Sequence, residues 1–262
     1  MTNIDGFTEP GEQPDYFEEF LGELGDPAAI REMRALSVQR LELRPGSRVI
    51  DVGCGVGAAT FPMASLVGPL GHTAGVDISC ALIEAARRRA TSGTAPEFQV
   101  ADATDLPYPS EFFDASYCER VFMYLPDRLS VLRELRRVVR PGGRVCIVDS
   151  DFDTAAIYST RRELTSKVES VMAAAVPNPN SGRELPALAR ESGLRNILVD
   201  TIAVTAPHRF LVLAGGGLMA EAVARGVLGK NELEEWFEEQ RLLNERGDFF
   251  HAWLAVRITC TV

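Results

Sequence analysis

Three aspartates in this 262-residue chain each follow a short apolar run, where a buried strand would end. Asp51 precedes a glycine-rich turn at 53–57, Asp77 ends the run AGVD, and Asp102 ends QVAD. Glycines let the backbone turn sharply and approach a ligand closely. Because the carboxyl ends of parallel strands meet at one edge of a sheet, we expect the three carboxylates to surround one pocket. Such a pocket suits a positively charged ligand.

The glycine-rich turn is compatible with two kinds of ligand. Residues 53–58 satisfy G-x-G-x-x-A, and an acid follows at Asp77, so a nicotinamide-dependent oxidoreductase is an alternative. Asp77 does not discriminate, because a carboxylate at that position accepts hydrogen bonds from ribose hydroxyls in either case. Asp51 would repel a pyrophosphate but suits the amino group of a methionine moiety. Asp102 can accept a hydrogen bond from the exocyclic amine of adenine, which a phosphate-bound nucleotide does not need.

The elements that must position these residues alternate between strands and helices from Ser47 onwards. Seven segments read as strands: 49–53, 73–78, 97–102, 113–118, 144–150, 194–206 and 249–262. Strands buried on both faces and joined by helices imply a mostly parallel sheet. The sequence therefore predicts an α/β fold, a doubly wound (Rossmann-like) seven-stranded sheet, with a helical N-terminal segment and a helical insertion before the last strand.

Five segments carry a resemblance to a known family: DVGCGVG, VDIS, ADATDLPY, FDASYCERVFMYLPD and LRRVVRPGGRV. In this order and spacing they resemble the successive motifs of class I S-adenosylmethionine-dependent methyltransferases, nearest to the ubiquinone/menaquinone-biosynthesis-like and natural-product enzymes. The resemblance is strong over about residues 45–150. It implies S-adenosylmethionine as cofactor and a small, partly apolar metabolite as methyl acceptor, plausibly in bacterial secondary metabolism. It leaves open whether O, N or C is methylated.

The same resemblance assigns donor contacts by position. It implies these contacts: Asp51, Gly53, Cys54 and Gly55 for the methionine part, Asp77 and Ile78 for the ribose and adenine, Asp102 and Ala103 for the adenine, and Cys118 for the sulfonium end. Two further residues precede the first strand. Arg34 could reach the methionine carboxylate. Tyr16 belongs to an aromatic stripe that is either core or, as in relatives, a lid over the donor.

The domain boundaries follow from the same patterns. Residues 1–44 are expected to form an N-terminal helical cap, and residues 45–262 the methyltransferase domain. Helical insertions on the acceptor side are expected at 151–181 and 208–247. The second insertion is rich in apolar residues and contains three consecutive glycines, so we expect a mobile lid whose apolar face binds the acceptor through Met219 and Trp236.

Methyl transfer from a sulfonium needs a general base only if the acceptor must lose a proton. His208 is the candidate base because it follows the sixth strand, although a surface loop histidine is the plain alternative. Asp149 and Asp151 follow the fifth strand, where they could orient an acceptor amine or hydroxyl, or cap the next helix.

Composition limits the remaining possibilities. The net charge of −10 disfavours nucleic-acid partners. The absence of a run of about 18 apolar residues argues against a membrane span. Five scattered cysteines lack metal-ligand spacing, which predicts no metal and fits thiols in a reducing cytoplasm. A donor-binding protein that catalyses another reaction, such as a cyclisation, is a further alternative, and the oligomeric state is not indicated.

Overall fold

A computed structural model of the chain describes residues 28–90 and 95–262. Tyr16 and its aromatic stripe lie outside the described residues. The strands are β1 (Arg48–Val52), β2 (His72–Asp77), β3 (Glu97–Val100), β4 (Phe113–Glu119), β5 (Val139–Ile157), β6 (Arg195–Thr205) and β7 (His251–Thr261). The helices are α2 (Ala28–Gln39), α3 (Thr60–Val67), α4 (Cys80–Arg89), the short 3₁₀ turn η3 (Phe122–Tyr124), α5 (Arg128–Val138), α6 (Arg162–Ala173), α7 (Ser181–Glu191), α8 (His208–Ala224) and α9 (Lys230–Arg246).

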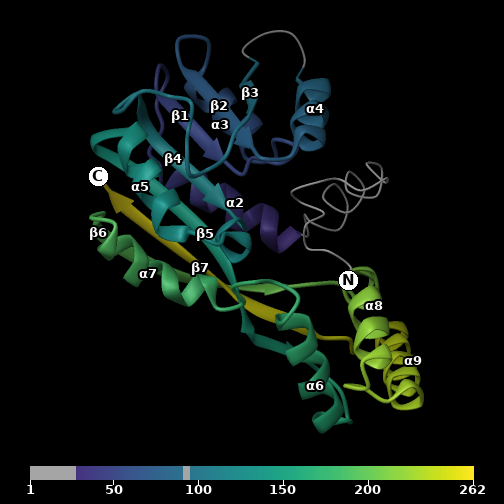
Figure 1. The fold of residues 1–262 in the computed structure, drawn as a ribbon. Coiled ribbons are helices and arrows are strands. Elements are labelled where there is room, and N and C mark those ends of the chain that lie inside the picture. The colour runs from purple at the N-terminus through teal and green to yellow at the C-terminus, as the bar shows by residue number, and fades with distance from the viewer. Residues whose placement is uncertain (1–27, 91–94) are drawn as a thin grey trace.

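The seven strands form one sheet in the order β3-β2-β1-β4-β5-β7-β6 (Figure 1). Neighbouring strands from β3 to β5 pair in parallel, and β7 pairs antiparallel with both β5 and β6. The predicted seven-stranded, mostly parallel, doubly wound sheet is therefore confirmed. Its carboxyl-terminal edge brings together the segments that follow β1, β2, β3 and β4.

Successive side chains of a strand point to opposite faces, so the sheet has a hydrophobic core on each face. Val49 of β1 packs in a core with α2 and α3, while the next residue, Ile50, packs with α5 and α7 on the opposite face. Two helix starts are capped as their residue types suggest. Ser79 Oγ accepts a hydrogen bond from Leu82 N at the start of α4, and Asp127 does the same for Ser130 N at the start of α5.

One predicted boundary is wrong. The helical insertion is expected to begin at residue 151, but β5 continues to Ile157 and the helix α6 begins at Arg162. The extension pairs with the first residues of β7 after an irregularity that follows Asp151. Thr154 Oγ1 holds this irregularity by donating to Asp151 O and accepting from Leu254 N. A distant strand thus decides the conformation of a segment whose local pattern is compatible with a helix.

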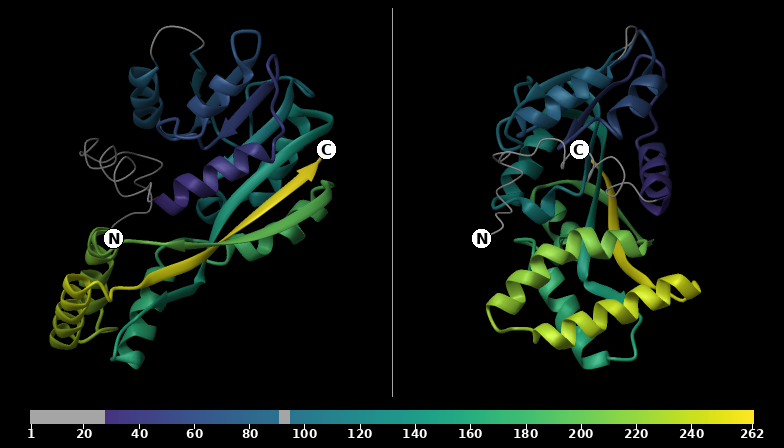
Figure 2. Two further views of the ribbon diagram at one scale, coloured as in Figure 1. Left: turned by 180° about the vertical axis from the view of Figure 1, so that it is seen from behind. Right: turned by 90° about the vertical axis from the view of Figure 1, so that its right-hand side faces the viewer.

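Helices α6, α8 and α9 group together at one end of the long strands β5 and β7, away from the helices that flank the sheet (Figures 1 and 2). They share a core that includes Met219 and Trp236, which are 1% and 0% exposed. Trp236 Nε1 donates a hydrogen bond to Thr165 Oγ1 of α6. The expectation that Met219 and Trp236 contact the acceptor is therefore corrected: their apolar surface is buried between the three helices.

We predict that Trp236→Ala lowers the free energy of unfolding by about 3–5 kcal/mol, because it leaves a large cavity and removes the hydrogen bond to Thr165. Leu213→Ala on α8 is the control, since that side chain is 45% exposed, and its effect should stay within about 0.5 kcal/mol. Chemical denaturation measures both. Equal effects of the two substitutions would show that Trp236 is not a core residue.

Candidate donor-binding site

A cavity of about 490 Å³ opens at the carboxyl-terminal edge of the sheet, between the segments that follow β1, β2, β3 and β4. It lies within the size range of small-molecule sites. Nine of the residues that the sequence singles out line this one cavity: Arg34, Asp51, Gly53, Cys54, Gly55, Asp77, Ile78, Asp102 and Ala103. Residues that lie up to 69 positions apart are thus brought around a single space.

The turn after β1 is fixed from two sides. The backbone N–H groups of Gly53 and Cys54 both donate to Val76 O of β2, at 2.8 and 3.0 Å. On the other side, Val121 packs so closely that a Cβ atom at Gly53 would lie 2.2 Å from its Cγ2 atom. Gly53 also has a φ of +73°, in the left-handed region that favours glycine. The turn therefore needs glycine both for its backbone angle and for its closeness to the segment after β4.

Backbone hydrogen bonds fix the carboxylate of Asp77 in the cavity lining. One oxygen accepts from Gly55 N and the other from Ser79 N, each at 2.9 Å. Burial raises the pKa of Asp77, while these backbone donors oppose that rise. Each carboxylate oxygen can accept more than one hydrogen bond, so both remain able to accept from a pair of vicinal hydroxyls.

Asp51 lies deeper, and its side chain is buried below the turn. Thr60 donates to its Oδ2 atom at 2.6 Å from the first turn of α3. Burial raises the pKa of Asp51 to about 7, and the nearby Glu119 carboxylate adds to the rise. A cationic group bound at this position would favour the charged form and offset the cost of burial.

The third aspartate lies at the open end of the cavity. Asp102 is exposed, and its Oδ1 atom accepts from Thr104 N and Thr104 Oγ1, at 2.8 and 2.7 Å. Ile78, which is 48% exposed, also lines this end. An exposed apolar side chain beside an oriented carboxylate suits a flat, polar-edged ring such as adenine.

Cys118 does not line the cavity, which corrects its assignment to the sulfonium end. It is fully buried in the core with α5 and α7. The strand β4 runs to Glu119, one residue beyond the predicted end, and side chains alternate along a strand. Tyr117 and Glu119 therefore face the cavity, and Cys118 faces the opposite side.

Glu119 is the main site residue that the sequence interpretation missed. Its two oxygens accept from Arg34 Nη2 and Nε, each at 2.9 Å, and Tyr117 OH donates to Oε2 at 2.7 Å. Although burial opposes it, the Arg34 charge lowers the pKa of Glu119. The alternation of apolar and polar residues in FDASYCE was the available signal for its position. Its partner Arg34 lies 85 residues away in α2, which no local pattern could indicate.

The expected acceptor-side residues lie outside the cavity lining. Asp149 is fully buried and accepts from Met123 N, Ser150 N and Ser181 Oγ, so it joins η3 to the start of α7. Burial raises its pKa to about 7.

Asp151 and His208 are also engaged elsewhere. Asp151 forms a two-bond ion pair with Arg183. His208 lies at the start of α8, and its ring packs edge-on against the ring of Phe249. Burial lowers the pKa of His208. The expectation that Asp149 and Asp151 orient an acceptor is therefore corrected, because partners within the protein occupy both carboxylates. His208 lies outside the cavity lining, and its role as general base stays a prediction.

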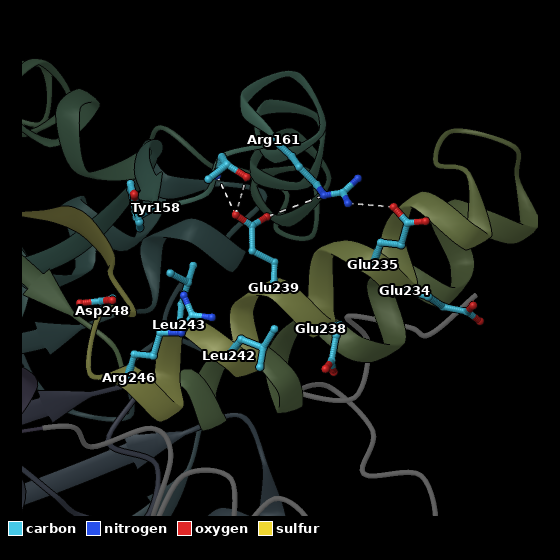
Figure 3. A pocket seen from close by; sticks show the side chains of 11 residues that line it. Tyr158, Arg161, Glu234, Glu235, Glu238, Glu239, Leu242, Leu243, Arg246 and Asp248 are labelled. Carbon is cyan, nitrogen blue, oxygen red and sulfur yellow. Dashed lines mark hydrogen bonds and ion pairs between the residues drawn. The ribbon is translucent and has the colours of Figure 1, made fainter.

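A second, larger hollow of about 920 Å³ lies between α9 and the segment that follows β5 (Figure 3). Its lining is mostly charged and exposed, and some of these charges pair with one another. Arg161 bridges Glu235 and Glu239, and Glu239 also accepts from Ser159 and Thr160. It contains neither the glycine turn nor the strand-end aspartates, which line the first cavity instead. Within the described residues, no helix is long and apolar enough to cross a membrane.

Comparison with known proteins places the chain in a family. Residues 43–241 match the family model described as a methyltransferase domain. The chain is 31% identical over 195 residues to O-methyltransferase resE of Aspergillus sclerotiorum, covering 72% of this chain and 69% of the relative. It is 38% identical over 122 residues to the 2-phytyl-1,4-naphtoquinone methyltransferase of Synechococcus elongatus, covering 45% and 52%. The chain spans about half the length of the first curated relatives that it matches.

A solved structure shows the same fold. It is an S-adenosylmethionine-dependent methyltransferase from Aquifex aeolicus, with a TM-score of 0.57, 16% identity, and coverage of 95% of this chain and 98% of that one. With its sheet order and its cavity, the chain belongs to the class I methyltransferases, as the sequence resemblance implied. S-adenosylmethionine is the methyl donor of this family.

We predict that Gly53→Ala destabilises the protein more than Gly55→Ala does. Both glycines have positive φ, so either alanine should cost about 1–2 kcal/mol. Only Gly53 adds the contact with Val121, which should cost about 1–3 kcal/mol more. Chemical denaturation without ligand measures the difference. Equal losses of unfolding free energy would mean that Val121 and the segment after β4 can shift without cost.

We predict a pH-dependent stability difference between Asp51→Asn and the parent protein. Because the pKa of Asp51 rises from 3.8 to about 7 on folding, the parent loses stability as the pH rises through this interval. Asparagine keeps an acceptor for Thr60 and carries no charge. The melting temperature of Asp51→Asn should therefore exceed that of the parent by more at about pH 8 than at about pH 5. A gap that does not change with pH would contradict the raised pKa.

Proposed function

We propose that the protein transfers the methyl group of S-adenosylmethionine to a small, partly apolar metabolite in bacterial secondary metabolism. The proposal rests on the convergence of the glycine turn and three strand-end aspartates on one cavity. The names of two relatives, a naphthoquinone methyltransferase and an O-methyltransferase, favour an acceptor of this kind. The acceptor atom is left open as O, N or C.

The described residues fit the donor part by part. Asp77 presents two oriented oxygens to a ribose, while Asp102 and Ile78 offer a carboxylate and an apolar surface to an adenine. Asp51 and Glu119 place negative charge at the methionine end, below the glycine turn. When bound, the donor supplies a methyl group on a sulfonium, which is already a good leaving group.

The contribution of the protein is then to hold donor and acceptor in line and to exclude water. The walls that remain for an acceptor are formed by the segment after β4, with Met123, Tyr124 and Leu125. Burial raises the pKa of Tyr124 to about 12, so its hydroxyl stays protonated. In the described part of the chain no histidine lines the cavity, which favours an acceptor that reacts without a dedicated imidazole base.

We predict that Asp77→Ala weakens the binding of S-adenosylhomocysteine about 10- to 100-fold, because a charge-assisted hydrogen-bonding site is worth about 1.5–3 kcal/mol. Asp248→Ala is the matched control, since this exposed aspartate lines the second hollow instead. Titration calorimetry measures both. Unchanged affinity in Asp77→Ala, or a loss in Asp248→Ala, would contradict the assignment of the donor to the first cavity.

The proposed reaction is tested with S-adenosylmethionine that carries a deuterated methyl group. The protein is incubated with bacterial metabolite extracts, and mass spectrometry searches for products that gain the labelled methyl. The proposal expects a labelled product with the parent protein and at least about a tenfold smaller yield with Asp77→Ala. Tight donor binding without any labelled product would favour the donor-binding or cyclising alternative. Binding of NADH in place of the donor would favour an oxidoreductase.

A further inference from the structure

Two arginines line the donor cavity within the described part of the chain, Arg34 and Arg120, and no lysine does. The sequence interpretation was that Arg34 could reach the methionine carboxylate. In the structure, two nitrogens of its guanidinium are hydrogen-bonded to Glu119, and both side chains are buried. Moving Arg34 to an anionic ligand would leave the buried Glu119 without its main counter-charge, which is costly.

Arg120 is held at the cavity by an unusual backbone. Its φ is +57°, a region that side chains other than glycine rarely adopt, and its N–H donates to Val148 O of β5 at 2.8 Å. Such local strain persists where the surrounding structure enforces it and is often found at functional sites. The next residue, Val121, packs directly on Gly53. Arg120 therefore lies beside the glycine turn, directly after β4 and next to Val148 in the middle of β5.

The guanidinium of Arg120 has an unfilled hydrogen-bonding capacity. Its Nε atom is buried and makes no hydrogen bond. Its ion pair with Glu119 is long, with 3.4 Å between Nε and Oε1. That carboxylate already accepts two hydrogen bonds from Arg34 and one from Tyr117. A buried donor without an acceptor costs free energy, which a bound anionic oxygen would recover.

We propose that Arg120, and not Arg34, is the anion-binding residue of this cavity: it receives an anionic oxygen, such as a carboxylate, from a ligand bound there. The inference rests on the proposed function. The oxygen has two possible sources, the methionine carboxylate of the donor and an acidic group of the acceptor. The first would pair Arg120 with the carboxylate while Asp51 faces the ammonium group. The second would make the acceptor an acid that binds ionised and needs no general base.

Binding measurements on Arg120→Gln and Arg120→Lys test the proposal. Glutamine and lysine face the same positive φ as arginine, so the backbone strain is matched. The first pair of probes is S-adenosylhomocysteine and 5′-methylthioadenosine, which lacks the amino-acid part. If the donor is the source, Arg120→Gln binds S-adenosylhomocysteine about 10- to 100-fold more weakly and 5′-methylthioadenosine unchanged, with partial recovery in Arg120→Lys.

The second pair of probes is benzoate and its neutral analogue benzamide, added to protein saturated with S-adenosylhomocysteine. If the acceptor is the source, the parent protein binds benzoate better than benzamide, and Arg120→Gln loses that preference while keeping its affinity for S-adenosylhomocysteine. Arg34→Gln is the comparison: because it releases Glu119, it should weaken S-adenosylhomocysteine and 5′-methylthioadenosine together.

Three results would overturn the proposal. Arg120→Gln could lose affinity for 5′-methylthioadenosine as much as for S-adenosylhomocysteine, which would indicate a structural role. It could keep every affinity of the parent protein, which would remove Arg120 from anion binding. Arg34→Gln could instead show the selective loss expected of Arg120→Gln. If the parent protein itself binds no S-adenosylhomocysteine, the proposed function fails first, and the inference about Arg120 fails with it.

Discussion

The close packing of the turn after β1 is the constraint on which the rest of the site depends. Gly53 lies between β2, whose Val76 O accepts two of the turn's N–H groups, and Val121, which leaves no room for a Cβ atom. This contact sets the position of the backbone that follows β4. The cavity and the strained backbone of Arg120 lie directly beside this contact. The absence of a side chain at Gly53 therefore lets the turn after β1 approach both β2 and the segment after β4.

Electrostatics explains why the buried carboxylates of the site have hydrogen-bonding partners. The Arg34 charge lowers the pKa of Glu119, whereas burial raises the pKa of Asp51. Burying charge without a partner is costly, so a site for a cationic ligand keeps part of its negative charge uncompensated until the ligand binds. Asp149 differs, because its carboxylate accepts hydrogen bonds from three donors of the protein. It joins η3 to α7 and does not line the cavity.

The cavity residues that follow β1, β2 and β3 were predictable because the sequence patterns that indicate them are local. Apolar runs that end in glycine or aspartate indicate strand ends, and parallel strands bring those ends together, so Asp51, Asp77 and Asp102 meet as expected. The failures involve distant partners. β5 continues because β7 pairs with it, Trp236 is buried because α6 covers it, and Glu119 depends on a helix 85 residues earlier. The predicted end of β4 was one residue too early. Because successive side chains of a strand point to opposite faces, Cys118 was assigned to the cavity in place of Tyr117 and Glu119.

The central claim is that the strand-end carboxylates hold an S-adenosyl ligand in one orientation across the carboxyl edge of the sheet. A crystal structure of the protein with S-adenosylhomocysteine tests it most directly. The account predicts that Asp77 contacts the ribose hydroxyls, that Asp102 lies at the adenine, and that the amino-acid end lies below the Gly53 turn, near Asp51 and Arg120. A ligand bound in the reverse orientation, or in the hollow beside α9, would contradict it.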